Sequence, residues 1–463
     1  MLPPQRKSRP GNRMLQTDRR RLLAMLGLAA LIPGAPACAR SRGEVLIVGA
    51  GVAGLAAGRQ LVQAGYSVRL IEARDRIGGR LHTSRVWPDM PMDLGASWIH
   101  GIKGNPLTEL AREAGAQHVA TSYDRAELHL SPAARQAGLV DAGEEAMADL
   151  VTRALARAER LDKDISLRAA VDRLVQGRRF SSGQRMQLDF YLSGKYVQEY
   201  SGGADRLSAW MMDEGREFGG EDVLFPGGYG QIARHLAQGL DIRLGHAVSE
   251  IRWHTPRVSL RCENGARFDA DHVIVAVPLG VLKAGRLRFD PPLPKAKQTA
   301  VARLEMGLLN KHFLRFEKVF WSPEADWHEL LKPAPDAWSE WVSLARAGNL
   351  PVLLGFTAAD AGRQIERLDG RAIQAQAMEA VRAMFGSAVP DPVGFQPTRW
   401  ASDPWTLGSY SFNAVGSGPV DRKALAAPEG VLHLAGEACS ADHPGTVHGA
   451  LLSGLAAARA ITG

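Results

Sequence analysis

The apolar residues of the chain gather in short continuous runs, the pattern of parallel strands buried on both faces. The first run covers residues 44–48 (EVLIV) and leads into the glycine-rich stretch 49–54 (GAGVAG). A helical pattern then extends to Gln63, Gly65 follows as a C-terminal cap, and a second strand is expected over 67–71. This order predicts a β-α-β unit.

Two similar runs lie far along the chain, at residues 271–277 (DHVIVAV) and 431–435 (VLHLA). Residues 144–177 instead show helical spacing, and we interpret their charges as a solvated helix face. We therefore expect a mixed α/β fold with two interleaved domains. The nucleotide-binding domain would be discontinuous, over 43–103, 222–290 and 396–463, and the second domain would comprise 104–221 and 291–395.

Composition narrows the class of protein. The chain has 463 residues, 45% of them hydrophobic and 23% charged, with 3 cysteines, which excludes a disordered chain, a collagen and a disulfide scaffold. Of the formal charge of +7, residues 1–42 contribute +8 and the other 421 residues −1. The charge of the folded part therefore gives no argument for binding nucleic acid or an anionic membrane.

The first 42 residues are typical of a targeting segment. Arg19, Arg20 and Arg21 precede an apolar stretch over 22–32 and a small-residue run over 35–39. That apolar stretch is too short to span a bilayer, which takes roughly 20 residues. We expect a signal peptide over 1–42 of the twin-arginine class, although Asp18 stands where that class has Ser or Thr, and hence a periplasmic or secreted protein. The alternatives are lipidation at Cys38 or a basic tail on a cytoplasmic protein.

The stretch after the first strand carries a dinucleotide-binding pattern. Gly49 permits the tight turn, Gly51 allows close approach of a pyrophosphate, and Gly54 lets the helix lie near the strand. The helix N-terminus would direct free N–H groups at the phosphates. Glu72, which is 23 positions after Gly49, ends the second strand and is placed to accept hydrogen bonds from a ribose diol. Without this context, the glycines would indicate only a turn.

The next segment favours FAD over NAD. Ile77-Gly78-Gly79-Arg80 supplies glycines that allow backbone approach, Gly79 among them, and a guanidinium at Arg80 that can reach the pyrophosphate. This continuation resembles FAD proteins with the glutathione-reductase type of Rossmann-like domain.

Several motifs together resemble the flavin-containing amine oxidase family, and within it the polyamine oxidase branch. They are DLGASWIHG over 93–101, FPGGYG over 225–230, AVPLG over 276–280, MGLLNK over 306–311 and LAGEA over 434–438. The matching segments run over about 44–106 and 225–458. The resemblance implies an FAD-binding domain interleaved with a substrate-binding domain of mixed sheet and helices.

The same resemblance assigns cofactor roles. Lys311 is the expected catalytic residue, holding a water against flavin N5; alone, it would be taken for a surface lysine. Val248 matches a backbone contact to adenine, and Glu437 matches a ligand of the ribityl chain. A helix that opens near Val447 would face the pyrimidine edge of the flavin, where its dipole stabilises negative charge.

Five residues are the expected substrate contacts. By resemblance, His100 lines the substrate tunnel, Tyr410 forms one wall of an aromatic cage, and Thr446 stands where the opposite wall often has a tyrosine. Trp400 would lie near the substrate face of the flavin. Glu199 aligns with a substrate-contacting acid, or is an ordinary exposed glutamate.

Ser409 stands where monoamine oxidases carry the cysteine that attaches the flavin, so we expect noncovalent FAD. Cys262 and Cys439 are expected to be free, and the spacing of the histidines indicates no metal site.

The implied activity is oxidation of an amine, most simply a polyamine such as spermine, spermidine or an acetylated form. Hydride would pass to flavin N5, the imine would be hydrolysed to an aldehyde and an amine, and O2 would reoxidise the flavin to give H2O2. Three alternatives stay open: an L-amino acid or monoamine oxidase, a flavin amine dehydrogenase with a periplasmic acceptor, and a silent flavoprotein that binds polyamines.

Overall fold

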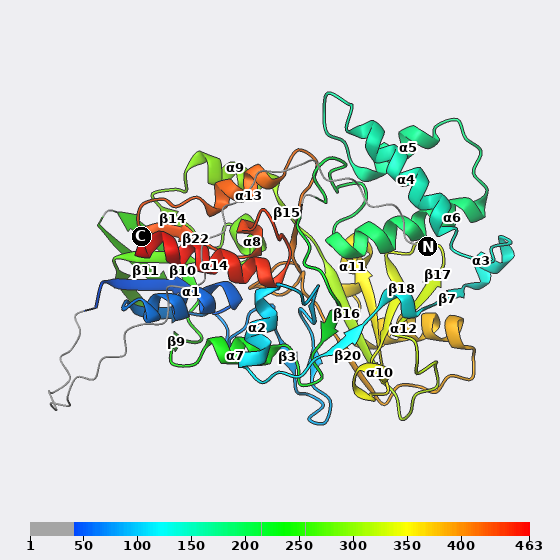
Figure 1. Ribbon diagram of the computed structural model, residues 1–463, viewed down its shortest axis with the longest axis horizontal. Helices are drawn as coiled ribbons and strands as arrows, with labels where there is room; N and C mark the ends of the chain where they lie inside the picture. Colours follow the sequence, from blue (N-terminus) through cyan, green and yellow to red (C-terminus); the bar gives the residue numbers. More distant parts are fainter. Residues whose placement is uncertain (1–40, 214, 255) are drawn as a thin grey trace, which may run out of the picture. The chain divides into compact units, whose positions relative to one another are not determined.

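Five parallel strands form the sheet that the apolar runs predict. The computed structural model (Figure 1) describes residues 41–213, 215–254 and 256–463. It orders these strands β22-β13-β1-β2-β9. Their bounds are β1 (Glu44–Val48), β2 (Ser67–Ile71), β9 (Asp241–Arg243), β13 (His272–Val275) and β22 (Leu432–Leu434). All neighbours pair in parallel, which confirms the four expected strands and adds β9.

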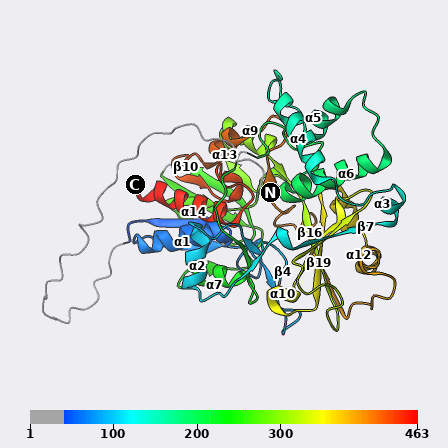
Figure 2. The ribbon, with the colours of Figure 1, turned by 45° about the vertical axis from the view of Figure 1, so that its right-hand side comes forward.

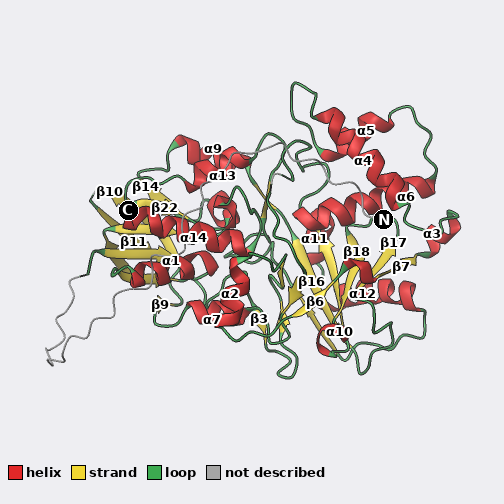
Figure 3. Ribbon diagram, in the orientation of Figure 1, coloured by secondary structure: helices red, strands yellow, loops and turns green. Residues whose placement is uncertain are grey.

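Both faces of this sheet are covered, which explains its continuous apolar runs. Val45 and Ile47 pack against α1 (Val52–Gln63) and α14 (Val447–Thr462), which lie side by side (Figure 3). Leu46 and Val48 pack on the opposite face, against a second sheet ordered β12-β11-β10-β14. That sheet comprises β10 (Val248–His254), β11 (Arg257–Cys262), β12 (Arg267–Ala270) and β14 (Arg288–Asp290).

A separate six-stranded sheet is ordered β20-β16-β19-β18-β17-β7 and is antiparallel except for the parallel β17–β7 edge. Its strands are β7 (Ala126–Leu130), β16 (Leu309–Arg315), β17 (Trp327–Leu331), β18 (Ala337–Ser343), β19 (Val352–Ala358) and β20 (Gly394–Pro397). Phe313, Trp327 and Phe356 share one face, which we term the inner face. Leu314 and Leu330 share the outer face, which α12 (Gly370–Phe385) covers.

A group of helices lies in the chain between β7 and the other five strands of this sheet. Helices α4 and α5 lie within the helical stretch expected over 144–177, and Figure 2 shows them grouped with α6. The π-helix η2 follows α6 without a break. The group comprises α3 (Pro132–Gln136), α4 (Glu144–Ala158), α5 (Leu167–Val175), α6 (Ser182–Leu192) and η2 (Ser193–Gln198).

The remaining elements are short. The helices are α2 (Pro106–Glu113), α7 (Gly230–Leu236), α8 (Leu279–Lys283), α9 (Lys295–Arg303), α10 (Ala345–Gly348), α11 (Ala359–Glu366) and α13 (Pro419–Ala426), with 3₁₀ turns η1 (Tyr123–Arg125) and η3 (Glu437–Cys439). The strands are β3 (Thr83–Ser84), β4 (Met92–Asp93), β5 (Trp98–Ile99), β6 (Val119–Thr121), β8 (Asp222–Leu224), β15 (Glu305–Met306) and β21 (Ser411–Phe412).

The strands of the parallel sheet all come from the three segments expected to bind the nucleotide, whereas β20 crosses the expected boundary at residue 396. Contacts group Ser41–Gly463 into one unit, so the division into two interleaved domains stays a prediction. The expected signal peptide and Cys38 lie outside the described residues, apart from residues 41 and 42. No described helix has the length and apolar character needed to cross a bilayer. Cys262 and Cys439 are buried and free.

Candidate cofactor and active site

A cavity of about 1010 Å³ lies between the carboxyl end of the parallel sheet and the inner face of the six-stranded sheet. Ligands of open α/β sheets bind at this end of the strands. Every residue expected to bind cofactor or substrate lines the cavity except Gly54. The cavity therefore brings together segments that are hundreds of positions apart in the chain.

The glycines of the turn after β1 have different roles: some are required for packing, and one leaves room for a ligand. Gly49 has φ +103°, and a Cβ there would lie 2.8 Å from the carbonyl oxygen of Ala276. A Cβ at Gly54 would collide with the carbonyl of Gly49, so Gly54 serves the close approach of helix and strand. A Cβ at Gly51 would meet no atom within 4 Å, and this glycine opens on the cavity. Gly51 is also the N-cap of α1 and offers no side chain, which leaves the first N–H groups of the helix to a ligand.

Glu72 lies at the carboxyl end of β2 and is buried. Its two carboxylate oxygens accept hydrogen bonds from the backbone N–H groups of Ala50, at 2.7 Å, and Arg74, at 2.9 Å. These bonds fix the carboxylate beside the glycine turn, at the cavity wall. Val248, the first residue of β10, lines the same end.

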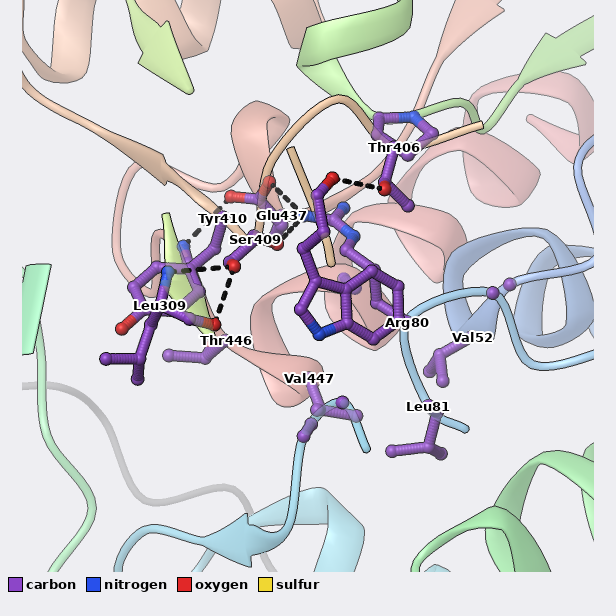
Figure 4. A pocket seen from close by; sticks show the side chains of 18 of the residues that line it. Val52, Arg80, Leu81, Leu309, Thr406, Ser409, Tyr410, Glu437, Thr446 and Val447 are labelled. Carbon is purple, nitrogen blue, oxygen red and sulfur yellow. Dashed lines mark hydrogen bonds and ion pairs between the residues drawn. The ribbon is translucent and has the colours of Figure 1, made fainter. Parts of the chain in front are cut away.

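Arg80 and Glu437 meet in the middle of the cavity wall (Figure 4). Nη1 of Arg80 donates to Oε1 of Glu437 and to the carbonyl of Ser409, both at 2.8 Å. Burial alone would raise the pKa of Glu437, but the charges of Arg80 and Arg422 and the hydroxyl of Ser411 hold it below its ordinary value. The sequence assigns Arg80 and Glu437 to separate parts of a cofactor, and the structure joins them in one ion pair.

Ser409, Tyr410, Thr446 and Val447 lie beside this pair (Figure 4). The Ser409 hydroxyl accepts from the N–H of Leu309 and donates to its carbonyl, both at 2.9 Å, and so ties this loop to β16. Thr446 is the N-cap of α14, because its Oγ1 accepts from the N–H of Gly449 at 2.9 Å. Val447 is thus the first helical residue, and its N–H belongs to the group that a helix start leaves free.

Lys311 projects from β16 on the inner face, two positions before Phe313. Its Nζ donates to the carbonyls of Gly95, at 2.6 Å, and Asp93, at 3.3 Å, and to the hydroxyl of Ser97. Burial lowers the pKa of Lys311 to about 8, against the opposing effect of the Asp93 charge. The ammonium is therefore easier to deprotonate than an exposed lysine.

The buried carboxyl of Asp93 interacts with the charge of Lys311. Burial raises the pKa of its carboxyl, while hydrogen bonds from Thr83 and from the N–H of Tyr229 and the charge of Lys311 oppose the rise. Trp400 contacts the residue that follows Asp93, because its Nε1 donates to the carbonyl of Leu94 at 3.1 Å. Its side chain therefore lines the cavity next to this segment.

The opposite end of the cavity is aromatic and acidic. Trp327 stacks on Trp98 at 6.0 Å and on Tyr123 at 4.2 Å between ring centroids, and all three rings line the cavity. The hydroxyl of Tyr410 lies 2.9 Å from the carbonyl of Gln198 and 3.0 Å from that of Glu199. Burial, followed by the charge of Glu199, raises the pKa of Tyr410.

His100 lies at the cavity rim with its side chain 58% exposed, and its Nδ1 is 3.0 Å from Oδ2 of Asp222. The surrounding protein lowers the pKa of His100, but the hydrogen bond and charge of Asp222 overcome this and leave it above its ordinary value. Glu199 is exposed and lines the cavity directly after the π-helix η2.

Sequence reasoning missed the aromatic wall and one acid, Glu340, which lines the cavity from the inner face of β18. The stretch AWSEWVS over 337–343 holds a signal, because Glu340 is its one charged residue in an otherwise largely buried strand. A buried strand with a lone carboxylate favours a functional interpretation.

The residues at the first end of the cavity fit FAD. Gly51 and Gly436 leave space that a side chain would fill, the start of α1 offers N–H donors, and Glu72 and Arg80 supply an acceptor and a guanidinium. The cavity continues beyond Ser409 and Val447, into space that a mononucleotide bound at this end would leave empty.

Comparison with known proteins identifies the family. The model for flavin containing amine oxidoreductases matches residues 52–462. Polyamine oxidase 4 of Oryza sativa subsp. japonica is 34% identical over 433 residues, which cover 90% of this chain and 88% of that protein. Polyamine oxidase 2 of Arabidopsis thaliana is 35% identical over 438 residues, with 90% and 87% covered.

The fold agrees with solved structures. Putrescine oxidase bound to putrescine aligns with a TM-score of 0.73 at 23% identity, over 90% of this chain and 98% of that one. With the cavity, its dinucleotide end and these matches together, the chain belongs to the flavin-containing amine oxidoreductase family and is an FAD-dependent amine oxidase.

Proposed function

We propose that the substrate is an amine with a second, remote ammonium group, most simply a polyamine. The observation that carries this proposal is the acidic end of the cavity, where Glu340 and Glu199 both line the wall. The names of the plant polyamine oxidases and of putrescine oxidase support it.

Glu340 stands directly opposite Glu329 across the antiparallel β17–β18 pair. Like charges in that position repel. Within the described residues, neither side chain has an ion-pair or hydrogen-bond partner. Burial, followed by the charges of Glu329 and Glu199, raises the pKa of Glu340 well above its ordinary value. An ammonium group that entered here would relieve the repulsion and recover part of the cost of burial.

The backbone leaves room for this carboxylate. A Cβ at Gly194 would lie 2.7 Å from Oε1 of Glu340, so a larger residue in the π-helix η2 would displace the acid. The same π-helix ends next to Glu199. Segments from two parts of the chain thus direct carboxylates into one cavity end.

The reacting nitrogen requires a different environment from the remote nitrogen. An alkylammonium with a pKa of roughly 10.4 has no lone pair to assist C–H cleavage. The aromatic wall of Trp98, Tyr123 and Trp327 would favour the neutral amine, while the remote nitrogen keeps its charge beside Glu340. Bound FAD supplies the two-electron oxidation of the carbon–nitrogen bond. Lys311, with its lowered pKa, would position water or a proton in the part of the cavity next to Gly95 and Ser97.

A second candidate, an L-amino acid oxidase, is favoured by one observation. Such an enzyme needs a guanidinium for the substrate carboxylate, and Arg125 lines the cavity without an ion-pair partner among the described residues. The other lining arginines already have partners. Arg74, Arg80 and Arg346 form ion pairs with Asp403, Glu437 and Asp326, and Arg286 and Arg422 donate to the carbonyl of Pro404 and to Asn413.

Anaerobic titration with spermine, N-acetylspermine, tyramine and leucine, followed by flavin bleaching, separates these candidates. We expect spermine to reduce the flavin at the lowest concentration. The variant Glu340→Gln should weaken the apparent affinity for spermine at least tenfold and leave tyramine within about twofold, and Glu317→Gln, at an exposed position, is the matched control. Preferential reduction by leucine, lost in Arg125→Ala, would establish the second candidate instead. A flavin that no amine reduces would indicate a silent binding protein.

The electron acceptor and the location are separate proposals. We propose that O2 reoxidises the flavin, which requires one H2O2 per turnover; a yield near zero, with turnover restored by an artificial acceptor, would indicate a dehydrogenase.

We also propose export by the twin-arginine route, because a bulky noncovalent cofactor is best inserted before translocation. Mass spectrometry of active protein from cells should find residues 1–42 removed, and an intact segment would refute export.

A further inference from the structure

A group of metal-ligand side chains lies on the outer face of the six-stranded sheet, away from the cavity. Glu127 and His129 are two positions apart on the edge strand β7 and therefore point to the same side. His328 lies directly opposite Glu127 on β17, in the parallel register. Among the described residues, these three side chains are the group of His, Cys, Asp and Glu that could hold a metal ion.

The distances within this group suit one small ion. Nε2 of His129 is 3.2 Å from Nδ1 of His328, and Nδ1 of His328 is 3.5 Å from Oε2 of Glu127. All three ligand atoms lie within 4.8 Å of one another. With metal–ligand bonds of about 2.0–2.1 Å and tetrahedral angles, ligand atoms are separated by about 3.3–3.4 Å. The side chains thus need little movement to coordinate an ion.

One aromatic ring packs against both imidazoles. Phe385 lies edge-on to His129 and to His328, each at 5.0 Å between ring centroids. Nε2 of His328 is buried without a hydrogen-bond partner among the described residues, and its Nδ1 is the atom near the other two ligands.

The group is open to solvent on one side. The side chain of Glu127 is 44% exposed, which leaves a path for an ion to enter and a carboxylate to offset its charge.

We propose that Glu127, His129 and His328 bind one divalent transition-metal ion of the zinc type, with solvent in the remaining position. Two imidazoles and a carboxylate form a ligand set that zinc uses with an open fourth position. The ion would join the edge strand β7 to β17. Because η1, with Tyr123, immediately precedes β7, the site would also brace the segment that carries one ring of the aromatic wall. This proposal does not depend on the identity of the amine.

The test uses untagged, chelator-treated holoenzyme and Zn²⁺ or Cu²⁺ alone. We expect one equivalent of Zn²⁺ by isothermal titration, a rise in Tm on binding, and hyperfine coupling to two nitrogens in the Cu²⁺ EPR spectrum. His129→Ala and Glu127→Gln, both at partly exposed positions, should weaken Zn²⁺ at least tenfold. The control is His235→Ala, which removes a histidine that pairs with Glu113 elsewhere.

Two results would overturn the proposal: no saturable Zn²⁺ binding to the wild-type protein, or binding that His129→Ala and Glu127→Gln leave unchanged. Folding of each variant is checked by its bound flavin absorbance, since that cofactor lies on the other face of the sheet.

Discussion

Replacing Lys311 by methionine should abolish a pH-dependent part of the protein's stability and change stability at neutral pH only slightly. The pKa of Lys311 falls from 10.5 to about 8 in the folded protein. This difference corresponds to a cost of roughly 3 kcal/mol for keeping the buried ammonium charged at pH 7. Three hydrogen bonds from Nζ, worth roughly 1 kcal/mol each, offset it. The two contributions nearly cancel. We therefore expect the free energy of unfolding of Lys311→Met at pH 7 to lie within about 1 kcal/mol of the wild-type value.

The sign of the pH dependence follows from the protons bound. Between about pH 8 and 10.5 the unfolded chain keeps the lysine proton while the folded protein has lost it, so the free energy of unfolding of the wild type rises with pH. The slope is about 1.4 kcal/mol per pH unit, which gives roughly 2 kcal/mol between pH 8 and 9.5. The methionine variant lacks this rise.

The assay is urea unfolding of both proteins at saturating FAD, at pH 7, 8, 9 and 9.5. Lys318→Met, at an exposed position, controls for the substitution itself. If the free-energy difference between wild type and Lys311→Met stayed constant across this range, the lysine would not be a buried, easily deprotonated amine, and the electrostatic account of the site would be wrong.

Three further predictions concern the cofactor and the reaction. Because Ser409 occupies the position of the flavin-attaching cysteine, acid precipitation should release FAD into the supernatant, and yellow colour retained in the pellet would contradict this. Lys311→Met with FAD bound should slow flavin reduction or reoxidation at least tenfold in stopped-flow measurements; wild-type rates for both steps would remove Lys311 from the mechanism. Gly51→Val should fold normally but bind FAD at least tenfold more weakly, whereas Gly54→Val should lower Tm even without FAD, because only the second side chain meets protein atoms; equal Tm values for the two FAD-free variants would refute that distinction.

The parts of the site that the sequence predicts are those with a local cause. The turn around Gly49 and Gly51 lies within a few residues of its strand and helix, so spacing alone locates it. Glu72 ends a strand in the same β-α-β unit and is equally predictable. Lys311 is located by resemblance, and only the sheet shows that it shares the inner face with Phe313 while Leu314 points away.

Other features depend on pairing between distant strands and could not be read from the chain. Glu340 becomes part of an acid pair only because its register places it opposite Glu329. His129 and His328 are 199 positions apart, so a search for metal-ligand spacing cannot detect them. Strand β9 could not be predicted, because it has only three residues, none of them fully buried, and they form no apolar run.

The π-helix η2 gives this enzyme a simple way to change its preference for substrates. Such a segment equals an α-helix with one extra residue, and each residue turns an α-helix by about 100°. Deleting one residue between Ser193 and Gln198 would restore regular winding and shift the side chains within this segment, where Gly194 now leaves room for Glu340. A single codon lost would thus reshape the cavity wall around that acid in one evolutionary step.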